Sequence, residues 1–520
     1  MIDKEHSEDA ETLKTAAEPI GEAADVTYDH VIKYTGLFGG VQGITMLASV
    51  VRNKIVSVLL GPSGLALINI YNTVVRFLND STNLGISFSA VKHLSELYEK
   101  GNKEEIEDNV VTIRTWCLLT GLFGCLLCMA FSPLISHLML KDYAHAWAFL
   151  CLAPCVLMMA VTGGELAILK SLRRLKTVAV ANVFCALAAL LISAPIYILF
   201  RAKGIVPSLL LINFAIMSVN LYFCNKIVRW KVDLRSRLHI LKGMPMVRLG
   251  IAYILAGVFG QGAELVIRAL LVSFGGDDGL DNVGFYQSGY SLAVSYASMV
   301  FIAIEADYFP RLSGACGHTK RMSSIINQQI EVCVLLTAPL LILLVMFMPI
   351  IVHVLYAKDF VAAEPMAVSA SFYMFFRALT LPVAYLPLAR GDSKMYLLTE
   401  FICDVFMAFA IPLSFKFFGL VGAGFALSAT GLLDFLIIHL LYRKAYQFAF
   451  SFRLVWFYIL QFILLATSIL TALADSGLVK WIVCALTFSL SFFISVRILR
   501  RETKILTKLW SKIKDKLHRK

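Results

Sequence analysis

Apolar runs long enough to cross a membrane recur along almost the whole of this 520-residue chain. A transmembrane helix needs about 20 predominantly apolar residues. Hydrophobic residues make up 59% of the chain and charged residues only 16%, whereas a soluble domain carries roughly 25% charged residues. Because only helices and closed barrels satisfy the backbone in lipid, long runs of this kind predict an all-α, multi-pass membrane protein with short connections.

Glycines, prolines and charges divide these runs into fourteen expected transmembrane helices. They cover residues 33–60, 65–90, 110–138, 145–169, 177–200, 205–225, 247–274, 281–309, 328–356, 362–389, 395–415, 419–441, 455–473 and 479–498. The longest connection, 227–246, divides the first twelve helices into six and six. The expected parts are a polar cytoplasmic tail (1–30), an N-lobe (31–230), a C-lobe (246–448), an extra hairpin (452–498) and a basic amphipathic cytoplasmic tail (499–520).

The two expected lobes carry traces of an internal repeat. An offset of 214 residues superposes Gly43 on Gly257, Lys54 on Arg268 and Gly61 on Gly275. Since an even number of helices precedes each lobe, both lobes enter the membrane from the same side and the repeat is parallel. Parallel repeats of this type are typical of carriers that bind cargo in a central cavity.

Loop cations predict the orientation. One set of loops holds most of the Lys and Arg, whereas the other holds only Lys141, Arg201, Lys203, Lys358, Lys416 and Lys480. By the positive-inside rule both termini are therefore expected in the cytoplasm. This asymmetry also explains much of the net charge of +12, so the charge does not indicate a nucleic-acid partner.

Two cations inside the expected spans are the strongest candidates for a binding site. Lys54 and Arg268 occupy equivalent repeat positions, and a charge at such a depth normally faces an internal, water-filled cavity. Arg52 lies about 200° around the helix from Lys54 and aligns with Val266, so the repeat favours Lys54. Glu264, one turn before Arg268, can neutralise it while the site is empty. Together these features predict an anionic cargo; helix-holding ion pairs are the structural alternative.

Other intramembrane charges are weaker candidates. Arg76 and Asp80 are four residues apart in the second span, and Arg377 lies in the tenth; structural and functional roles are equally compatible with them. Three acids, Glu400, Asp404 and Asp434, are candidates for proton coupling, although Glu400 also fits an interface position. Glu165, near a predicted span end, is expected to reach the surface.

No P-loop, nucleophile elbow or HExxH motif occurs in the sequence, so neither an enzyme, an ATP-driven pump nor a cofactor is expected. A membrane polymerase or ligase would need a larger outer loop for its catalytic groups. A MATE-type cation or drug antiporter would need an acidic cavity, which the central cations disfavour.

Several short motifs, in order through residues 33–445, resemble the Wzx-type polysaccharide flippases. This family belongs to the MOP superfamily with the MATE exporters and the lipid II flippase. The motifs are Lys54-Ile55 with 60–65 (LGPSGL), 169–173 (LKSLR), 267–271 (IRALL), 283–287 (VGFYQ), 308–313 (YFPRLS) and 395–400 (MYLLTE).

The resemblance implies translocation of an undecaprenyl-pyrophosphate-linked oligosaccharide, an O-antigen or capsular repeat unit, from the inner to the outer leaflet of the bacterial inner membrane by alternating access. Lys54 and Arg268 would then hold the pyrophosphate. It further implies membrane lipids as partners, a polysaccharide polymerase and chain-length machinery as partner candidates, and a monomer. The extra hairpin (452–498) departs from the usual twelve helices and keeps a lipid II flippase open as an alternative.

Overall fold

Helices make up nearly all of the computed structural model, which describes residues 22–100, 103–233, 237–298, 301, 308, 311–312, 315, 319–474 and 477–502. The first part of the chain forms α2 (Glu22–Thr82), α3 (Ile86–Lys100), α4 (Lys103–Leu140), α5 (Ala146–Ser171), α6 (Leu175–Phe200), η2 (Arg201–Gly204) and α7 (Ile205–Asn225). The second part forms α8 (Arg237–Phe274), η3 (Gly276–Asp278), α9 (Gly279–Tyr290), η4 (Ser291–Ser295), α11 (Thr319–Leu355), η5 (Lys358–Ala363), α12 (Glu364–Arg390), α13 (Ser393–Tyr446), α14 (Phe452–Ala474) and α15 (Leu478–Glu502).

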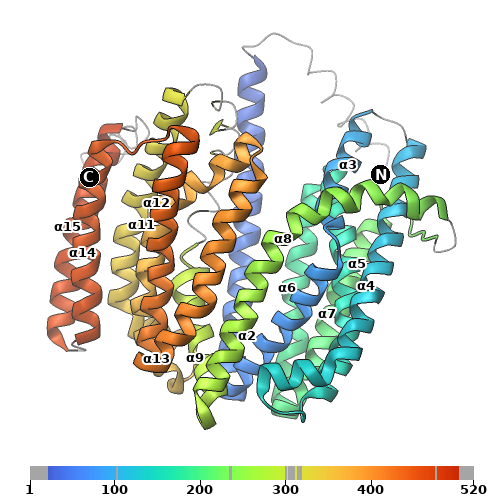
Figure 1. The fold of residues 1–520 in the computed structure, drawn as a ribbon, viewed down its shortest axis with the longest axis horizontal. Coiled ribbons are helices and arrows are strands. Elements are labelled where there is room, and N and C mark those ends of the chain that lie inside the picture. The colour runs from blue at the N-terminus through green and yellow to red at the C-terminus, as the bar shows by residue number, and fades with distance from the viewer. Residues whose placement is uncertain are drawn as a thin grey trace, which may run out of the picture.

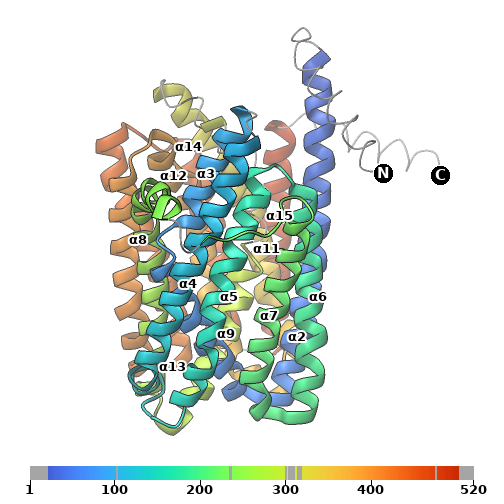
Figure 2. The same cartoon turned by 90° about the vertical axis from the view of Figure 1, so that its right-hand side faces the viewer.

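The helices stand roughly parallel to one another. Figure 1 shows α4 to α7 on one side of the molecule and α11, α12, α14 and α15 on the other, with part of α2 and α8 between them. Figure 2, turned by a right angle, shows the same common direction. One large apolar cluster runs from Ile70 of α2 to Leu465 of α14, and a smaller one joins α3, α4 and α5 around Ile113. Many outward side chains are apolar and exposed, such as Phe418 and Leu478, as lipid-facing positions require.

The expected all-α membrane fold is confirmed. In the part of the chain that the structure describes, ten helical segments are long and apolar enough to cross a membrane. Three of them, Gly43–Thr82, Lys176–Asn225 and Lys394–Tyr446, each contain two of the expected spans. The count of fourteen spans and the division into two lobes stay predictions.

Several expected boundaries differ from the observed ones. The second span was expected over 65–90, but α2 ends at Thr82 and α3 begins at Ile86. Helix α8 begins at Arg237, ten residues before its expected start, and α2 begins at Glu22, within the expected tail. The span expected over 281–309 contains the helix α9 and then a π-helical turn at Ser291–Ser295. The predicted ends of the chain, 1–21 and 503–520, lie outside the described residues.

Asp392 links the two ends of α13. Its Oδ1 accepts a hydrogen bond from the Met395 backbone N–H at 3.1 Å, and its Oδ2 accepts one from the Tyr446 hydroxyl at 2.8 Å. The first contact caps the start of α13, and the second reaches its last residue. These hydrogen bonds, which favour the charged carboxylate, hold the pKa of Asp392 below its ordinary value.

Two glycines interrupt long helices with nearly the same backbone conformation. Gly61 in α2 has φ 67° and ψ −169°, and Gly419 in α13 has φ 63° and ψ −152°. Figure 1 shows the chain descending before Gly61 and rising after it. At Gly275, which the repeat aligns with Gly61, φ is −79°, and the positive φ falls on Gly276 at 59°. The sequence repeat is therefore not matched residue for residue at this turn.

Gly61→Ala and Gly419→Ala should each destabilise the protein by about 1–3 kcal/mol, because this backbone region is open essentially to glycine alone. Thermal unfolding in detergent measures the effect. Gly43→Ala is the matched control, since Gly43 is helical and a Cβ there would meet nothing within 4 Å. Equal melting temperatures for all three variants would contradict the strained-turn interpretation.

Candidate functional site

Arg268 is buried on α8 and binds two side chains. Its Nη1 donates to Glu264 Oε2 at 2.9 Å and to the Glu264 carbonyl oxygen at 3.1 Å, so the ion pair that the i,i+4 spacing predicts is formed. Its Nη2 donates to Gln287 Oε1 of α9 at 2.8 Å. The remaining guanidinium donor, Nε, is buried without a hydrogen-bond partner among the described residues. An unsatisfied buried donor is costly, so this atom is poised to bind an anion.

Two small cavities meet at Gln287. One, of about 20 Å³, is lined by Glu264, Ile267, Arg268, Tyr286, Gln287, Tyr290 and Met407. The other, of about 100 Å³, is lined by Arg52, Asn53, Val56, Leu65, Ile68, Asn69, Asn72, Gln287, Ser291 and Tyr356. The second cavity is rich in amide side chains, which can both donate and accept hydrogen bonds. Gln287, which lines both, places Arg52 and Arg268 around one polar space.

Arg52, which the repeat disfavoured, occupies the place in which Lys54 was expected. It lines the larger cavity, and its Nε is buried without a hydrogen-bond partner in the described part of the chain. The next residue, Asn53, donates from Nδ2 to the Tyr296 hydroxyl at 3.4 Å. Two arginines therefore each offer an unused donor near Gln287.

Lys54 binds the end of α11 instead of lining either cavity. Its Nζ donates to the His353 carbonyl oxygen at 2.8 Å and to the Tyr356 carbonyl oxygen. Nearby, the Ala357 backbone N–H donates to Ser57 Oγ at 3.0 Å. Carbonyl groups at a helix C-terminus carry partial negative charge, which a lysine side chain stabilises. Lys54 thus fastens α2 to the end of α11.

More contacts continue this fastening towards the kink of α2. Ser63 donates a hydrogen bond to Asp281 Oδ1 of α9. Gly284 of α9 packs so closely on Pro62 that an added Cβ would lie 2.3 Å from the Pro62 carbonyl oxygen. We refer to these contacts of Lys54, Ser57, Pro62 and Ser63 with α9, α11 and the residues after it as the α2 seam.

Lys54→Met should open the α2 seam. Two hydrogen bonds from a charged donor are lost, so the closed population should fall about tenfold or more. Cysteines placed at Ser57 and Ala357 report closure by disulfide formation. Lys358→Met is the matched control, because Lys358 is an exposed cation two residues beyond Tyr356. An unchanged cross-linking yield in Lys54→Met would contradict the role assigned to this side chain.

Arg377 is surrounded by acids of α13. Its Nη1 lies 3.7 Å from Asp434 Oδ2, and Glu400 is close enough to interact with it electrostatically. Asp404 Oδ2 is buried without a hydrogen-bond partner among the described residues and faces Gly260 of α8, where a Cβ would lie 3.6 Å away. Glu264 also interacts electrostatically with Asp404. The acids named as coupling candidates therefore gather within reach of the Arg268–Glu264 pair.

Arg76 and Asp80 line neither of these cavities. Arg76 is exposed, and Asp80 Oδ1 accepts a hydrogen bond from Asn79 Nδ2 at 2.9 Å. Arg76 interacts with Asp80 electrostatically, as the spacing of four residues suggests. Their position on α2 gives no direct link to Gln287.

The strongest buried ion pair involves Arg114, a residue that the sequence analysis overlooked. Arg114 Nε and Nη2 donate to Glu165 Oε1 and Oε2 at 2.8 and 2.9 Å, and both side chains are 1% exposed. The expectation that Glu165 reaches the surface was wrong, because Arg114 of the neighbouring helix α4 neutralises it. Opposite charges in two consecutive spans were the signal that could have revealed this pair.

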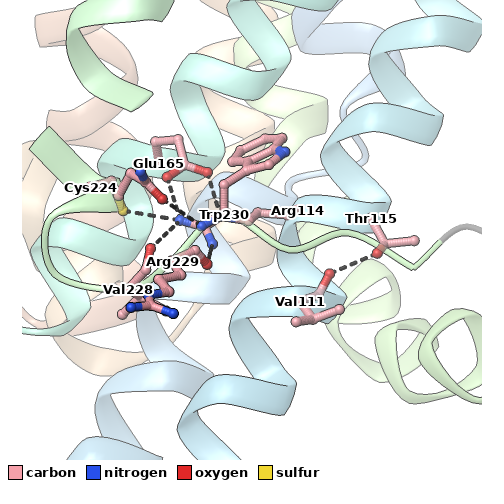
Figure 3. Close-up of polar contacts among 9 residues, drawn as sticks. Val111, Arg114, Thr115, Glu165, Cys224, Val228, Arg229 and Trp230 are labelled. Atoms are coloured by element: carbon pink, nitrogen blue, oxygen red, sulfur yellow. Dashed lines mark hydrogen bonds and ion pairs between the residues drawn. The ribbon is translucent and has the colours of Figure 1, made fainter. Parts of the chain in front are cut away.

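Arg114 also holds the segment that follows α7. It donates to the carbonyl oxygens of Arg229 at 2.7 Å and Val228 at 3.2 Å, and its guanidinium lies 4.9 Å from the centre of the Trp230 ring. Figure 3 shows these contacts converging on one side chain. The connection between α7 and α8 is thereby fixed to α4 and α5.

Comparison with known proteins agrees with this architecture. Residues 55–365 match the family described as "Polysaccharide biosynthesis protein", which covers more than half of the chain and includes Arg268 and Gln287. No curated protein matches the sequence.

Solved structures share the fold at low sequence identity. The lipid II flippase MurJ in an inward closed conformation is 16% identical with a TM-score of 0.64, covering 90% of this chain and 99% of that one. An inward-facing multidrug resistance MATE family transporter of the MOP superfamily is 14% identical with a TM-score of 0.62, covering 76% and 94%. A MOP superfamily transporter from Pyrococcus furiosus, noted for reversed polarity of its binding pocket, is 14% identical with a TM-score of 0.54, covering 78% and 93%.

The expected resemblance is therefore confirmed: the chain has the fold of MOP superfamily transporters and flippases, and it belongs to the polysaccharide biosynthesis protein family.

Proposed function

We propose that the protein translocates an undecaprenyl-pyrophosphate-linked oligosaccharide, an O-antigen or capsular repeat unit, across the bacterial inner membrane. The observation that carries this proposal is the pair of unpartnered guanidinium Nε atoms of Arg52 and Arg268, on two cavities that meet at Gln287. Guanidinium groups bind phosphate oxygens with strong, charge-assisted hydrogen bonds. The amides of Asn53, Asn69 and Asn72 would bind sugar hydroxyls.

Alternating access would supply the movement. With both termini in the cytoplasm, as the loop charges predict, the α2 seam lies at the outer end and closes it. The cavities of about 20 and 100 Å³ hold little more than a few water molecules, so the helices must separate to admit a headgroup. Release of Lys54 from the carbonyls of His353 and Tyr356 would then open the outer side.

Coupling to protons is assigned to the acids of α13. A carboxylate buried without a partner is costly, and proton uptake by Asp404 would remove that cost. Glu264 interacts with both Asp404 and Arg268, so a proton on Asp404 would alter the charge balance around Arg268. Asp434, paired with Arg377, is the second proton-binding candidate, and Glu400 is the third.

Asp404→Asn combined with Asp434→Asn should abolish the dependence of transport on a proton gradient. Proteoliposomes with and without an imposed gradient measure this. Glu105→Gln is a control, because Glu105 is an exposed acid in the first turn of α4. Gradient-dependent transport that persists in the double variant would count against proton coupling through these residues.

Reconstitution tests the transport function itself. Proteoliposomes carrying a labelled undecaprenyl-pyrophosphate oligosaccharide should move it between leaflets, and Arg52→Gln with Arg268→Gln should abolish this movement. Transport of a cationic drug with no effect on the glycolipid would instead support a MATE-type antiporter. That alternative fits the cavities less well, because two arginines line them.

A lipid II flippase is the second candidate, since the likeness to that fold covers 90% of this chain. Depletion in cells discriminates between the two. Loss of surface polysaccharide without lysis supports the proposal, whereas lysis supports lipid II as the cargo.

A further inference from the structure

A separate cavity of about 470 Å³ lies on the other side of the Arg377 cluster, among α12, α13, α14 and the residues that connect α13 to α14. Its walls are mostly apolar, and its lining includes Leu379, Phe435, Ala449, Leu454 and Ile459. The volume is that of a small-molecule site and far exceeds an ordinary packing void. Aromatic contacts of α12 with α14, such as Phe375 against Tyr458 at 4.6 Å, hold one wall in place.

Three polar side chains line this apolar cavity. Arg443, in the last turns of α13, is exposed and forms no hydrogen bond or ion pair within the part of the chain that the structure describes. His439 stacks between Phe435 and Phe450, with ring centres 6.1 and 5.8 Å apart. The Tyr458 hydroxyl is buried and has no hydrogen-bond partner among the described residues.

This combination restricts the chemistry of the occupant. The apolar walls require a hydrocarbon portion, and a small free anion would leave them uncovered. Arg443, at the level where α13 ends and α14 begins, requires an anionic group beside that hydrocarbon. The Tyr458 hydroxyl requires an acceptor deeper in the cavity, such as an ester carbonyl. A phospholipid with a net negative headgroup meets all three requirements.

We propose that the cavity bounded by Leu379, His439, Arg443 and Tyr458 is a binding site for one anionic glycerophospholipid, with its phosphate on Arg443 and an acyl chain against the walls of α12 and α14. The site does not include Arg52, Arg268 or Gln287. Its occupation would fix the C-terminal hairpin, α14 and α15, against α12 and α13, and this holds whatever cargo the central cavities accept.

Native mass spectrometry of the full-length protein, titrated with phosphatidylglycerol or phosphatidylethanolamine, tests the site. One phosphatidylglycerol should bind about tenfold more tightly to the wild type than to Arg443→Gln, since a charge-assisted contact is lost. Lys444→Gln is the matched control: the adjacent exposed cation lines none of this cavity, and its affinity should match the wild type. Ala449→Trp, which fills the space, should abolish binding of both lipids.

Three outcomes would overturn the assignment. Equal phosphatidylglycerol affinity in Arg443→Gln and the wild type would exclude the headgroup contact. Undiminished binding in a monodisperse Ala449→Trp protein would exclude the cavity. Tighter binding of undecaprenyl phosphate than of phosphatidylglycerol would identify a polyprenyl chain as the occupant instead.

Discussion

Arg268→Ala should abolish export of the lipid-linked oligosaccharide, reducing transport at least about a hundredfold, because two or more charge-assisted contacts to phosphate are lost. Arg268→Lys should retain only part of the activity, since an ammonium cannot reproduce the planar fork that reaches Glu264 and Gln287 together. Surface polysaccharide in cells expressing each variant measures the effect.

A second pair of variants separates substrate binding from folding. Arg268→Ala alone leaves Glu264 without its partner, so Arg268→Ala with Glu264→Gln removes the uncompensated charge. The account predicts that this double variant is present in the membrane and monodisperse yet still inactive. Full export by either the single or the double variant would contradict a cargo-binding role for Arg268.

Arg114→Met should be the most destabilising single substitution, costing about 3–5 kcal/mol, because it leaves the Glu165 charge buried at 1% exposure without a partner. It also removes the hydrogen bonds to Val228 and Arg229 that fix the segment after α7. Thermal unfolding of the purified protein measures the loss.

The double variant Arg114→Met with Glu165→Leu should recover most of this stability, since both charges are then replaced by apolar groups of similar size. Arg173→Met is a surface control, because Arg173 is exposed at the end of α5. If Arg114→Met melts at the wild-type temperature, or if the double variant is no better than the single one, the buried pair does not have the stabilising role assigned to it.

Helices were predictable from the sequence wherever hydropathy alone determined the outcome. Long apolar runs bounded by charges or glycine correspond to α4, α5, α6 and α7 within a few residues. Prediction failed where a local backbone feature broke the pattern. The break between α2 and α3 near Leu84, with φ of 50°, and the π-helical turn at Ser291 leave the apolar pattern unchanged.

The candidate site was predictable only in part, because hydropathy does not give the direction of a side chain. Arg268 and Glu264 lie on one helix, so their spacing was enough to predict the pair. The repeat favoured Lys54 over Arg52, but Lys54 finds backbone carbonyls at the end of α11, a partner about 300 residues away that no local pattern reveals. Gln287 appeared only as one letter of a motif, and its bridging position depends on how α9 packs beside α8.

Glycolipid analysis of each leaflet in cells tests the central claim most directly, after deletion of the protein and restoration as wild type, Arg52→Gln or Arg268→Gln. The account predicts that undecaprenyl-linked oligosaccharide accumulates on the cytoplasmic leaflet without the protein and with either variant, and that the wild type restores the outer-leaflet pool. An unchanged leaflet distribution after deletion would contradict it.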